Sequence, residues 1–91
     1  MKIEFDPLKN KCNLRQHGIA LSFAEQLEWD AMISWPDRRY AYDEVRMNAL
    51  VPCGVKCFAV TFVERCEKVR ILSIRSASRK EREYYARNYH Y

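Results

Sequence analysis

The stretch that most constrains the fold is residues 69–85, because its hydrophobic period changes in the middle. Residues 69–76 are rich in branched apolar side chains, which is the composition of a strand half buried in a sheet. Ser78 then begins a segment without Gly or Pro, and Glu81 follows three positions later, the capping-box signature of a helix start. The sequence therefore predicts a strand that leads directly into a helix.

Basic residues collect at this junction, and the last third of the chain holds the whole charge excess. Residues 1–63 carry 8 Lys and Arg against 8 Asp and Glu, whereas residues 64–91 carry 8 against 4. Amide groups at the start of a helix also favour an anion. Such a surface attracts phosphate backbones or an acidic protein partner. The cations nearest the junction are Arg70, Arg75, Arg79, Lys80 and Arg82.

The length of the chain and its N-terminal residues limit which class of protein it can belong to. A chain of 91 residues is expected to form one domain over residues 1–91. Its start lacks the apolar stretch of a signal peptide, and no run is long enough to span a membrane, so we expect a cytoplasmic protein with reduced cysteines. Cys53, Cys57 and Cys66 loosely resemble a zinc site, but the C-x3-C spacing is not a strong zinc pattern. We expect no metal and no cofactor.

The N-terminal third predicts a short strand followed by a helix. Residues 3–5 alternate apolar and polar side chains. Asp6 and Pro7 then provide an N-cap carboxylate and a proline at the first helical position, and Gly18 can end the helix in the left-handed conformation. The predicted helix runs from residue 7 to about residue 16.

The faces of this helix and the next one can also be assigned from spacing. Leu8 is expected on the packed face of the first helix and Asn13 on its solvated face. Ser22 and Glu25 form a second capping-box pattern, which predicts a helix over residues 22–29. The outward residues of that helix are acidic or amide-bearing, which argues against DNA reading by it.

The rest of the chain predicts strands and one loop. Residues 55–63 place apolar side chains on both faces, as a central strand does. By alternation, Arg75 is expected on the same side of its strand as Val69 and Ile71. Residues 36–44 form a polar loop with two tyrosines and two adjacent arginines. The predicted strands after the second helix cover residues 31–35, 45–52, 55–63 and 69–76. This order predicts an α+β domain with two N-terminal helices packed on a mostly antiparallel sheet and a C-terminal helix.

Several segments, taken in order, resemble the BrnT family over nearly the whole chain. They are Ile-Glu-Phe-Asp-Pro-Leu-Lys-Asn at 3–10, Asn-Leu-Arg-Gln-His-Gly-Ile at 13–19, Ser-Phe-Ala-Glu at 22–25, Asp-Glu-Val-Arg at 43–46, Phe-Val-Glu-Arg at 62–65 and the stretch at 69–84. The resemblance implies a RelE-like fold and a ribonuclease toxin of a bacterial type II toxin-antitoxin system, acting on cellular RNA. It also implies a BrnA-type antitoxin that holds the toxin inactive in a hetero-oligomer, with operator DNA reached only through that antitoxin.

Metal-independent RNA cleavage uses the 2′-hydroxyl of the RNA as nucleophile, so the protein must accept a proton, stabilise the phosphorane charge and protonate the leaving oxygen. Arg65, Arg75 and Arg79 suit the second task because a guanidinium matches phosphate geometry. Glu64 and His17 compete as the base. The remaining expected RNA contacts are Lys56, Arg46, Arg70, Lys80, Arg82 and Tyr84.

Each of these assignments has a structural alternative. His17 can cap the end of its helix, Glu64 and Arg65 can form a surface pair, and Arg79 can pair with Glu83 along its own helix. The alternative function is a catalytically inactive binding module that holds an antitoxin and co-represses the operon through it. RNA affinity that falls steeply with salt, without any product, would identify that module.

Overall fold

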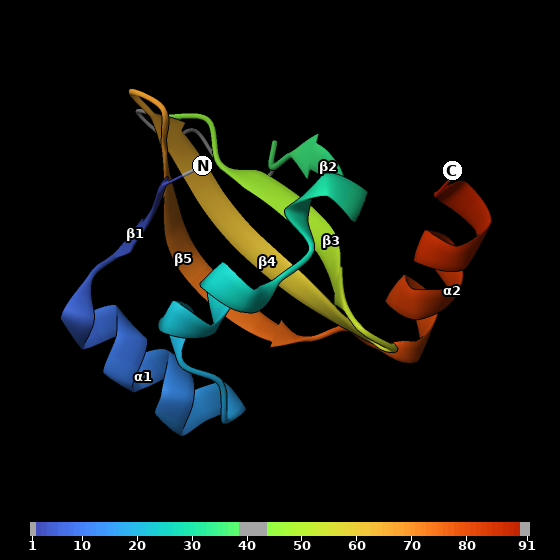
Figure 1. Cartoon of the computed structure of the whole chain (residues 1–91), viewed down its shortest axis with the longest axis horizontal. Helices are drawn as coiled ribbons and strands as arrows, with labels where there is room; N and C mark the ends of the chain where they lie inside the picture. Colours follow the sequence, from blue (N-terminus) through green and yellow to red (C-terminus); the bar gives the residue numbers. More distant parts are fainter. Residues whose placement is uncertain (1, 39–43, 90–91) are drawn as a thin grey trace.

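A single five-stranded sheet organises the computed structural model, which describes residues 2–38 and 44–89 (Figure 1). The strands lie in the order β1-β5-β4-β3-β2. Their bounds are Lys2–Phe5 for β1, Ile33–Pro36 for β2, Met47–Cys53 for β3, Lys56–Arg65 for β4 and Lys68–Ser76 for β5. β1 pairs with β5 in parallel, and the other neighbouring strands are antiparallel. The predicted α+β class and the central place of β4 are confirmed. Most of the predicted loop over residues 36–44 lies outside the described residues.

The first helix, α1, spans Pro7–His17 and has the predicted ends. The carboxylate of Asp6 accepts the N–H of Leu8 at 2.8 Å. Gly18 adopts a φ of 72°, a conformation that costs glycine little, and its N–H donates to the carbonyl of Leu14 at 2.8 Å. Leu8, expected on the packed face, is instead exposed.

The second predicted helix is not an α-helix but two 3-10 turns, η1 at Leu21–Gln26 and η2 at Trp29–Ala31. No side chain of η1 caps it, so the pattern of Ser22 and Glu25 does not form a capping box. The side-chain carbonyl of Asn10 on α1 accepts the N–H of Leu21 at 2.6 Å instead. The start of η1 is therefore fixed by a residue eleven positions earlier, which a local pattern does not reveal.

The hydrophobic core lies between the sheet and these turns. Figure 1 looks onto this face, with η1 crossing in front of β4 and β5. Phe62 on β4 is 1% exposed and meets the ring of Trp29 edge-on at 5.6 Å. The fully buried members of this core are Leu21, Ala24, Val51, Ile71 and Ile74. The other face of the sheet, away from α1 and the turns, is called the open face below.

A β-bulge in β5 reverses the predicted side of Arg75. Thr61 pairs with Ser73 and Phe62 pairs with Ile71, so Leu72 is an extra residue in β5. The extra residue shifts the alternation by one, which places Ile74 in the core together with Ile71. Arg75, predicted on the side of Ile71, therefore lies on the open face.

Asn13, predicted to be solvated, is buried between α1 and β5. Its amide nitrogen donates to the carbonyls of Ile19 at 2.7 Å and Ile74 at 2.8 Å, and its oxygen accepts the N–H of Ile74 at 3.2 Å. Because β1 pairs with β5 only over Lys68–Ile71, this edge of β5 needs another partner at Ile74. The Asn13 amide supplies it.

Replacing Asn13 with Ala should lower the free energy of unfolding by about 2–3 kcal/mol, because the backbone groups of Ile74 lose their partners. Urea unfolding followed by circular dichroism measures the difference. Gln16→Ala is the matched control, since Gln16 is an exposed amide of the same helix, and it should stay within about 0.5 kcal/mol of the original protein. Equal effects of the two substitutions would contradict the assigned role of Asn13.

The C-terminal helix, α2, spans Arg79–Asn88 and begins at the predicted capping box. The N–H of Glu81 donates to the Ser78 hydroxyl at 3.2 Å, and the N–H of Ser78 donates to the Glu81 carboxylate at 2.8 Å. α2 stands beside the sheet rather than over the core, and none of its described residues is buried (Figure 1). Within residues 2–38 and 44–89, no helix combines the length and apolar character needed to cross a membrane.

Candidate active site

The open face of the sheet forms the floor of a groove of about 530 Å³, called the sheet groove below. The register places Asn48, Thr61 and Ser73 side by side on three neighbouring strands. The Thr61 hydroxyl and the side-chain oxygen of Asn48 are hydrogen-bonded at 3.0 Å. The next row toward α2 contains Ala59 and Arg75. The floor of the groove is thus polar at its centre and ends at a guanidinium.

Arg75 is held at that end by the first turn of α2. Its Nη1 and Nη2 atoms donate to the two oxygens of Glu81 at 2.7 and 3.0 Å. The same carboxylate closes the capping box with Ser78, so the start of the helix fixes the position of the guanidinium. The hydrogen bond from Arg75, supported by those from Ser78, lowers the pKa of Glu81 to about 2. The same pairing with Glu81 raises the pKa of Arg75.

This ion pair predicts an acid-sensitive contribution to stability. Glu81 has an ordinary pKa of 4.5 and a folded pKa of about 2, so its contribution is complete above pH 4.5 and is lost as the pH falls toward 2. Urea unfolding between these pH values should therefore show a steeper loss of stability for the original protein than for Glu81→Gln. Glu83→Gln, which removes a more exposed carboxylate of the same helix, should leave most of the slope in place.

A second basic cluster lies farther along the open face, beside a hollow of about 280 Å³. Arg65 follows Thr61 and Val63 on the same side of β4, and its Nε and Nη2 atoms donate to the two carboxylate oxygens of Glu44. The hydrogen bond from Arg65 lowers the pKa of Glu44. Arg46 and Arg70 line the same hollow, and Arg70 lies 3.6 Å from Glu4. With about 3.3 Å per strand residue, the row of Ala59 and the row of Val63 are about 13 Å apart.

The predicted catalytic side chains of Arg79 and Glu64 lie apart from both arginine sites of the open face. Arg79 pairs with Glu83 at 3.1 Å and is 86% exposed, as its structural alternative proposed. Glu64 pairs with Val69, a core residue, so it points to the side of β4 opposite to Arg65. The three arginines predicted to face a shared groove are therefore placed apart: Arg75 lines the sheet groove, Arg65 lines the hollow farther along the same face, and Arg79 lines neither.

His17 lies in a separate hollow of about 590 Å³ between the end of α1 and the turn before β4. Lys56 lines the same hollow, and Phe23 and Phe58 meet there edge-on at 5.1 Å. Because Phe58 points into the core, this hollow opens on the face opposite to the sheet groove. The structure thus brings His17 and Lys56 together but separates both from Arg75.

The remaining predicted contacts belong to α2. Arg82 donates to the carbonyl of Ala77 at 2.9 Å and so ties the helix to the end of β5. Lys80 and Tyr84 line a hollow of about 430 Å³ next to Trp35. Tyr84 is 44% exposed, which places it at the surface rather than in the core.

Sequence reasoning missed the polar floor of the groove. Asn48, Thr61 and Ser73 are single polar residues in three different strands, and only the register shows that they form a row. Glu81 was predicted as a helix cap but not as the partner of Arg75. For Thr61 the available signal was a single hydroxyl-bearing residue within a segment, residues 55–63, that is otherwise mostly apolar.

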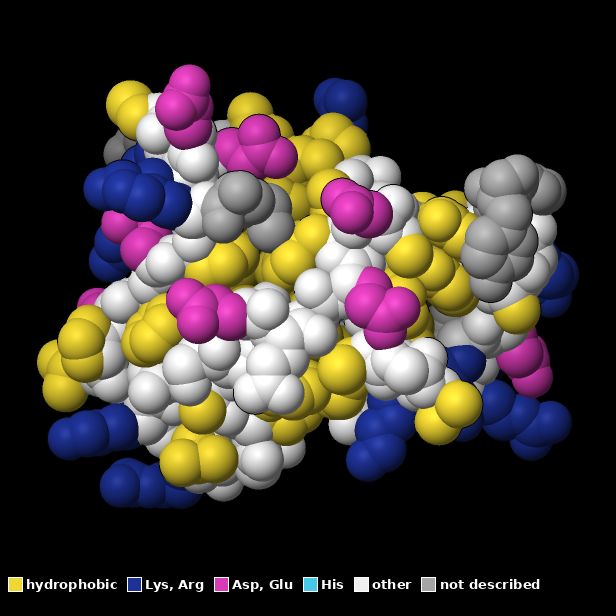
Figure 2. Space-filling model, in the orientation of Figure 1, with side chains coloured by type: hydrophobic (Ala, Val, Ile, Leu, Met, Phe, Trp, Pro, Cys, Tyr) yellow, Lys and Arg dark blue, Asp and Glu magenta, His cyan; other side chains and the backbone are white. Residues whose placement is uncertain are grey.

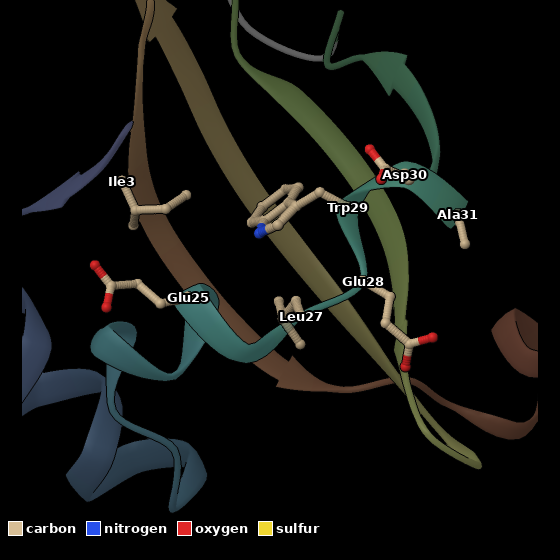
Figure 3. A pocket seen from close by; sticks show the side chains of 7 residues that line it. All are labelled: Ile3, Glu25, Leu27, Glu28, Trp29, Asp30 and Ala31. Atoms are coloured by element: carbon tan, nitrogen blue, oxygen red, sulfur yellow. The ribbon is translucent and has the colours of Figure 1, made fainter. Parts of the chain in front are cut away.

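The face that carries the turns has the opposite charge at its centre. Figure 2 shows acidic side chains over the middle of this face and Lys and Arg mainly along its margins. A hollow of about 650 Å³ is rimmed there by Glu25, Glu28 and Asp30, with Trp29 and Leu27 between them (Figure 3). Carboxylates repel phosphate, so this hollow is unsuited to RNA.

The four cysteines are free thiols, and burial raises the pKa of Cys57. Within the part of the chain that the structure describes, no group of three or more His, Cys, Asp and Glu side chains is placed to hold a metal ion.

A comparison of the sequence with models of known protein families finds a match over most of the chain. The family model described as "Ribonuclease toxin, BrnT, of type II toxin-antitoxin system" matches residues 5–81, which include the last residue of β1, all of α1, β2 to β5 and the start of α2. No curated protein is similar enough in sequence to be a relative. The matched region contains both arginine sites of the open face and ends at Glu81.

Proposed function

Because the chain belongs to the BrnT family of ribonuclease toxins of type II toxin-antitoxin systems, we propose that it cleaves RNA on the open face of its sheet, by attack of the RNA's own 2′-hydroxyl and without a metal ion. The observation that carries the location is the pair of arginine sites on one face of β4, separated by a polar floor. A nucleic-acid strand needs cations spaced along its path and room for bases between them. The opposite face offers carboxylates at its centre instead.

Arg75 has the geometry for the scissile phosphate. Its guanidinium is only about half exposed and is aimed by Glu81 across the end of the sheet groove. A phosphate presents two oxygens to a guanidinium fork as a carboxylate does, so the scissile phosphate can take the place of Glu81. Arg65 and Arg70 then bind phosphates farther along the strand.

When the scissile phosphate replaces the Glu81 carboxylate at Arg75, the released carboxylate can serve as the general base. Arg75 is the main cause of the low pKa of Glu81, so loss of that partner raises the pKa, and the adjacent phosphate charge raises it further. Glu81 then accepts the proton of the 2′-hydroxyl. The 2′-oxygen bonds to phosphorus, the bond from phosphorus to the 5′-oxygen breaks, and the leaving 5′-oxygen takes a proton from water. The products are a 2′,3′-cyclic phosphate and a 5′-hydroxyl. Glu64 and His17 lie on the other side of the sheet from this position.

A BrnA-type antitoxin is the expected partner of a toxin of this family. We propose that it inhibits by covering the sheet groove with a segment whose carboxylates or apolar side chains compete with RNA for Arg75 and Arg65. The toxin and antitoxin then form a hetero-oligomer that reaches operator DNA through the antitoxin alone.

The test of the mechanism is cleavage of an end-labelled mixed-sequence RNA, with a chelator present, on a denaturing gel. We expect cleavage with cyclic phosphate ends, and no cleavage of the same RNA carrying 2′-O-methyl groups, because the nucleophile is then blocked. Loss of cleavage on chelation, or cutting of the methylated RNA, would contradict the mechanism. Salt-sensitive binding without any product would favour the inactive binding module.

A further inference from the structure

A slot lined by aromatic rings opens from the end of the sheet groove. It is the hollow of about 430 Å³ between the sheet and α2, and it is called the aromatic slot below. Trp35, Leu50 and Glu81 line both the slot and the groove. Leu50 is 1% exposed and lies on the open face, so it forms an apolar floor under the rings. A ligand that places a phosphate on Arg75 therefore has an apolar recess directly beside that phosphate.

The two rings of the slot differ from the neighbouring aromatic residues in their polar atoms. Trp29 donates its indole N–H to the carbonyl of Ala24 at 2.8 Å, and Tyr85 donates its hydroxyl to the carbonyl of Ala31. Among the described residues, neither the indole N–H of Trp35 nor the hydroxyl of Tyr84 makes such a bond. Trp29 and Tyr85 are thus used to hold the fold together, whereas Trp35 and Tyr84 keep their polar edges available.

The ring faces are available as well. Trp35 and Tyr84 meet edge-on, with centroids 6.1 Å apart and an interplanar angle of 69°, so the two rings do not cover each other's faces. Trp35 is 38% exposed and Tyr84 is 44% exposed. The exposed parts of these two neighbouring rings are apolar surface that a ligand stacked on them would remove from water.

We propose that the aromatic slot binds one nucleobase of the RNA, the base on one side of the phosphate held by Arg75. The inference rests on the proposed function, and it deepens it by naming Trp35 and Tyr84 as the residues that select how RNA is seated at the cleavage site. A base stacks on the free face of either ring, and the two polar edges and Lys80 at the rim contact its edge or the next phosphate. The occupant is a nucleobase rather than an apolar peptide side chain because the recess is continuous with a phosphate-binding guanidinium.

The experiment uses oligonucleotides with a single cleavable ribonucleotide in DNA, in which the base on either side of the scissile phosphate is replaced by an abasic site. For the original protein, removal of one of the two bases should lower kcat/KM by about 5- to 150-fold, the range for loss of one base–aromatic stack. In the Trp35→Ala and Tyr84→Ala double variant, the base-containing and abasic substrates should be cleaved at equal rates. Trp35→Phe with Tyr84 intact should retain the preference, since a ring remains.

Tyr85→Phe is the matched control, because it removes a tyrosine hydroxyl of the same helix that is used inside the fold. It should leave the ratio between the two substrates unchanged. Circular dichroism of each variant reports folding, and the ratio of two rates on one enzyme sample does not depend on the fraction that is folded. Equal cleavage of intact and abasic substrates by the original protein would overturn the proposal and leave the slot to a protein partner. If the intact substrate is cleaved equally well by Arg75→Ala, the proposed site fails instead, whatever the slot does.

Discussion

Replacement of Arg75 by Ala is expected to lower kcat/KM for RNA cleavage by about 10²- to 10³-fold, while the protein stays folded. The loss is that of a charged donor aimed at the phosphorane, for which mutational costs of this size are usual. Stability should change little, since the side chain of Arg75 is 47% exposed and a pair of this kind contributes about 1 kcal/mol or less. Single-turnover cleavage of labelled RNA, beside urea unfolding of both proteins, measures the two quantities.

Two further variants make the result specific. Arg15→Ala removes the same charge from an exposed position on α1 and should cleave RNA at nearly the original rate. Arg75→Lys keeps the charge but not the fork, so it should recover only part of the activity. Equal losses in Arg15→Ala and Arg75→Ala would mean that total charge matters rather than the end of the sheet groove.

The second large effect is expected from Glu81→Gln, which should lower kcat by about 10²- to 10⁴-fold, the usual contribution of a general base. Glutamine can accept the N–H of Ser78 as glutamate does, so the start of α2 is kept. Its amide cannot take the proton of the 2′-hydroxyl. The rate of cleavage in rapid kinetics at saturating RNA measures the change.

The dependence of kcat on pH separates a base from a residue that only positions Arg75. With Glu81 as base, kcat of the original protein rises with pH until the carboxylate in the RNA complex is ionised, and Glu81→Gln loses this rise. A residue that acts only by orienting the guanidinium would give a lower kcat with the same pH profile. An unchanged profile in Glu81→Gln would therefore remove the base assignment and leave the role of Arg75 intact.

Short sequence patterns correctly predicted those helix ends that are capped by residues close by in the chain. Asp6 with Pro7, Gly18, and Ser78 with Glu81 all cap as their patterns indicate, because these hydrogen bonds join neighbours in the chain. The prediction of a second α-helix was wrong because the start of that segment is decided by a residue distant in the chain. Its first N–H groups bond to Asn10 on another helix, so the capping pattern of its own residues was not used.

For the candidate site, the sequence predicted the kinds of side chain but not how they are arranged in space. The excess of cations after residue 63 and the strand-to-helix junction at Arg75 both indicated a phosphate-binding surface, and Arg75 and Arg65 do line the open face. His17 and Lys56 have suitable chemistry but belong to the other side of the sheet. Residue type reports what a side chain can do, whereas the face it occupies depends on the sheet.

The sequence by itself determined the α+β class, the caps of α1 and α2, the central place of β4 and the basic C-terminal third, since composition, period and local hydrogen bonds fix these. Only the tertiary structure decided which face carries Arg75, because one extra residue at Leu72 reverses the alternation of β5. It also decided the burial of Asn13 and the meeting of Trp35 with Tyr84. These features join residues far apart in the chain, and their positions are set by strand register and packing rather than by neighbouring residues.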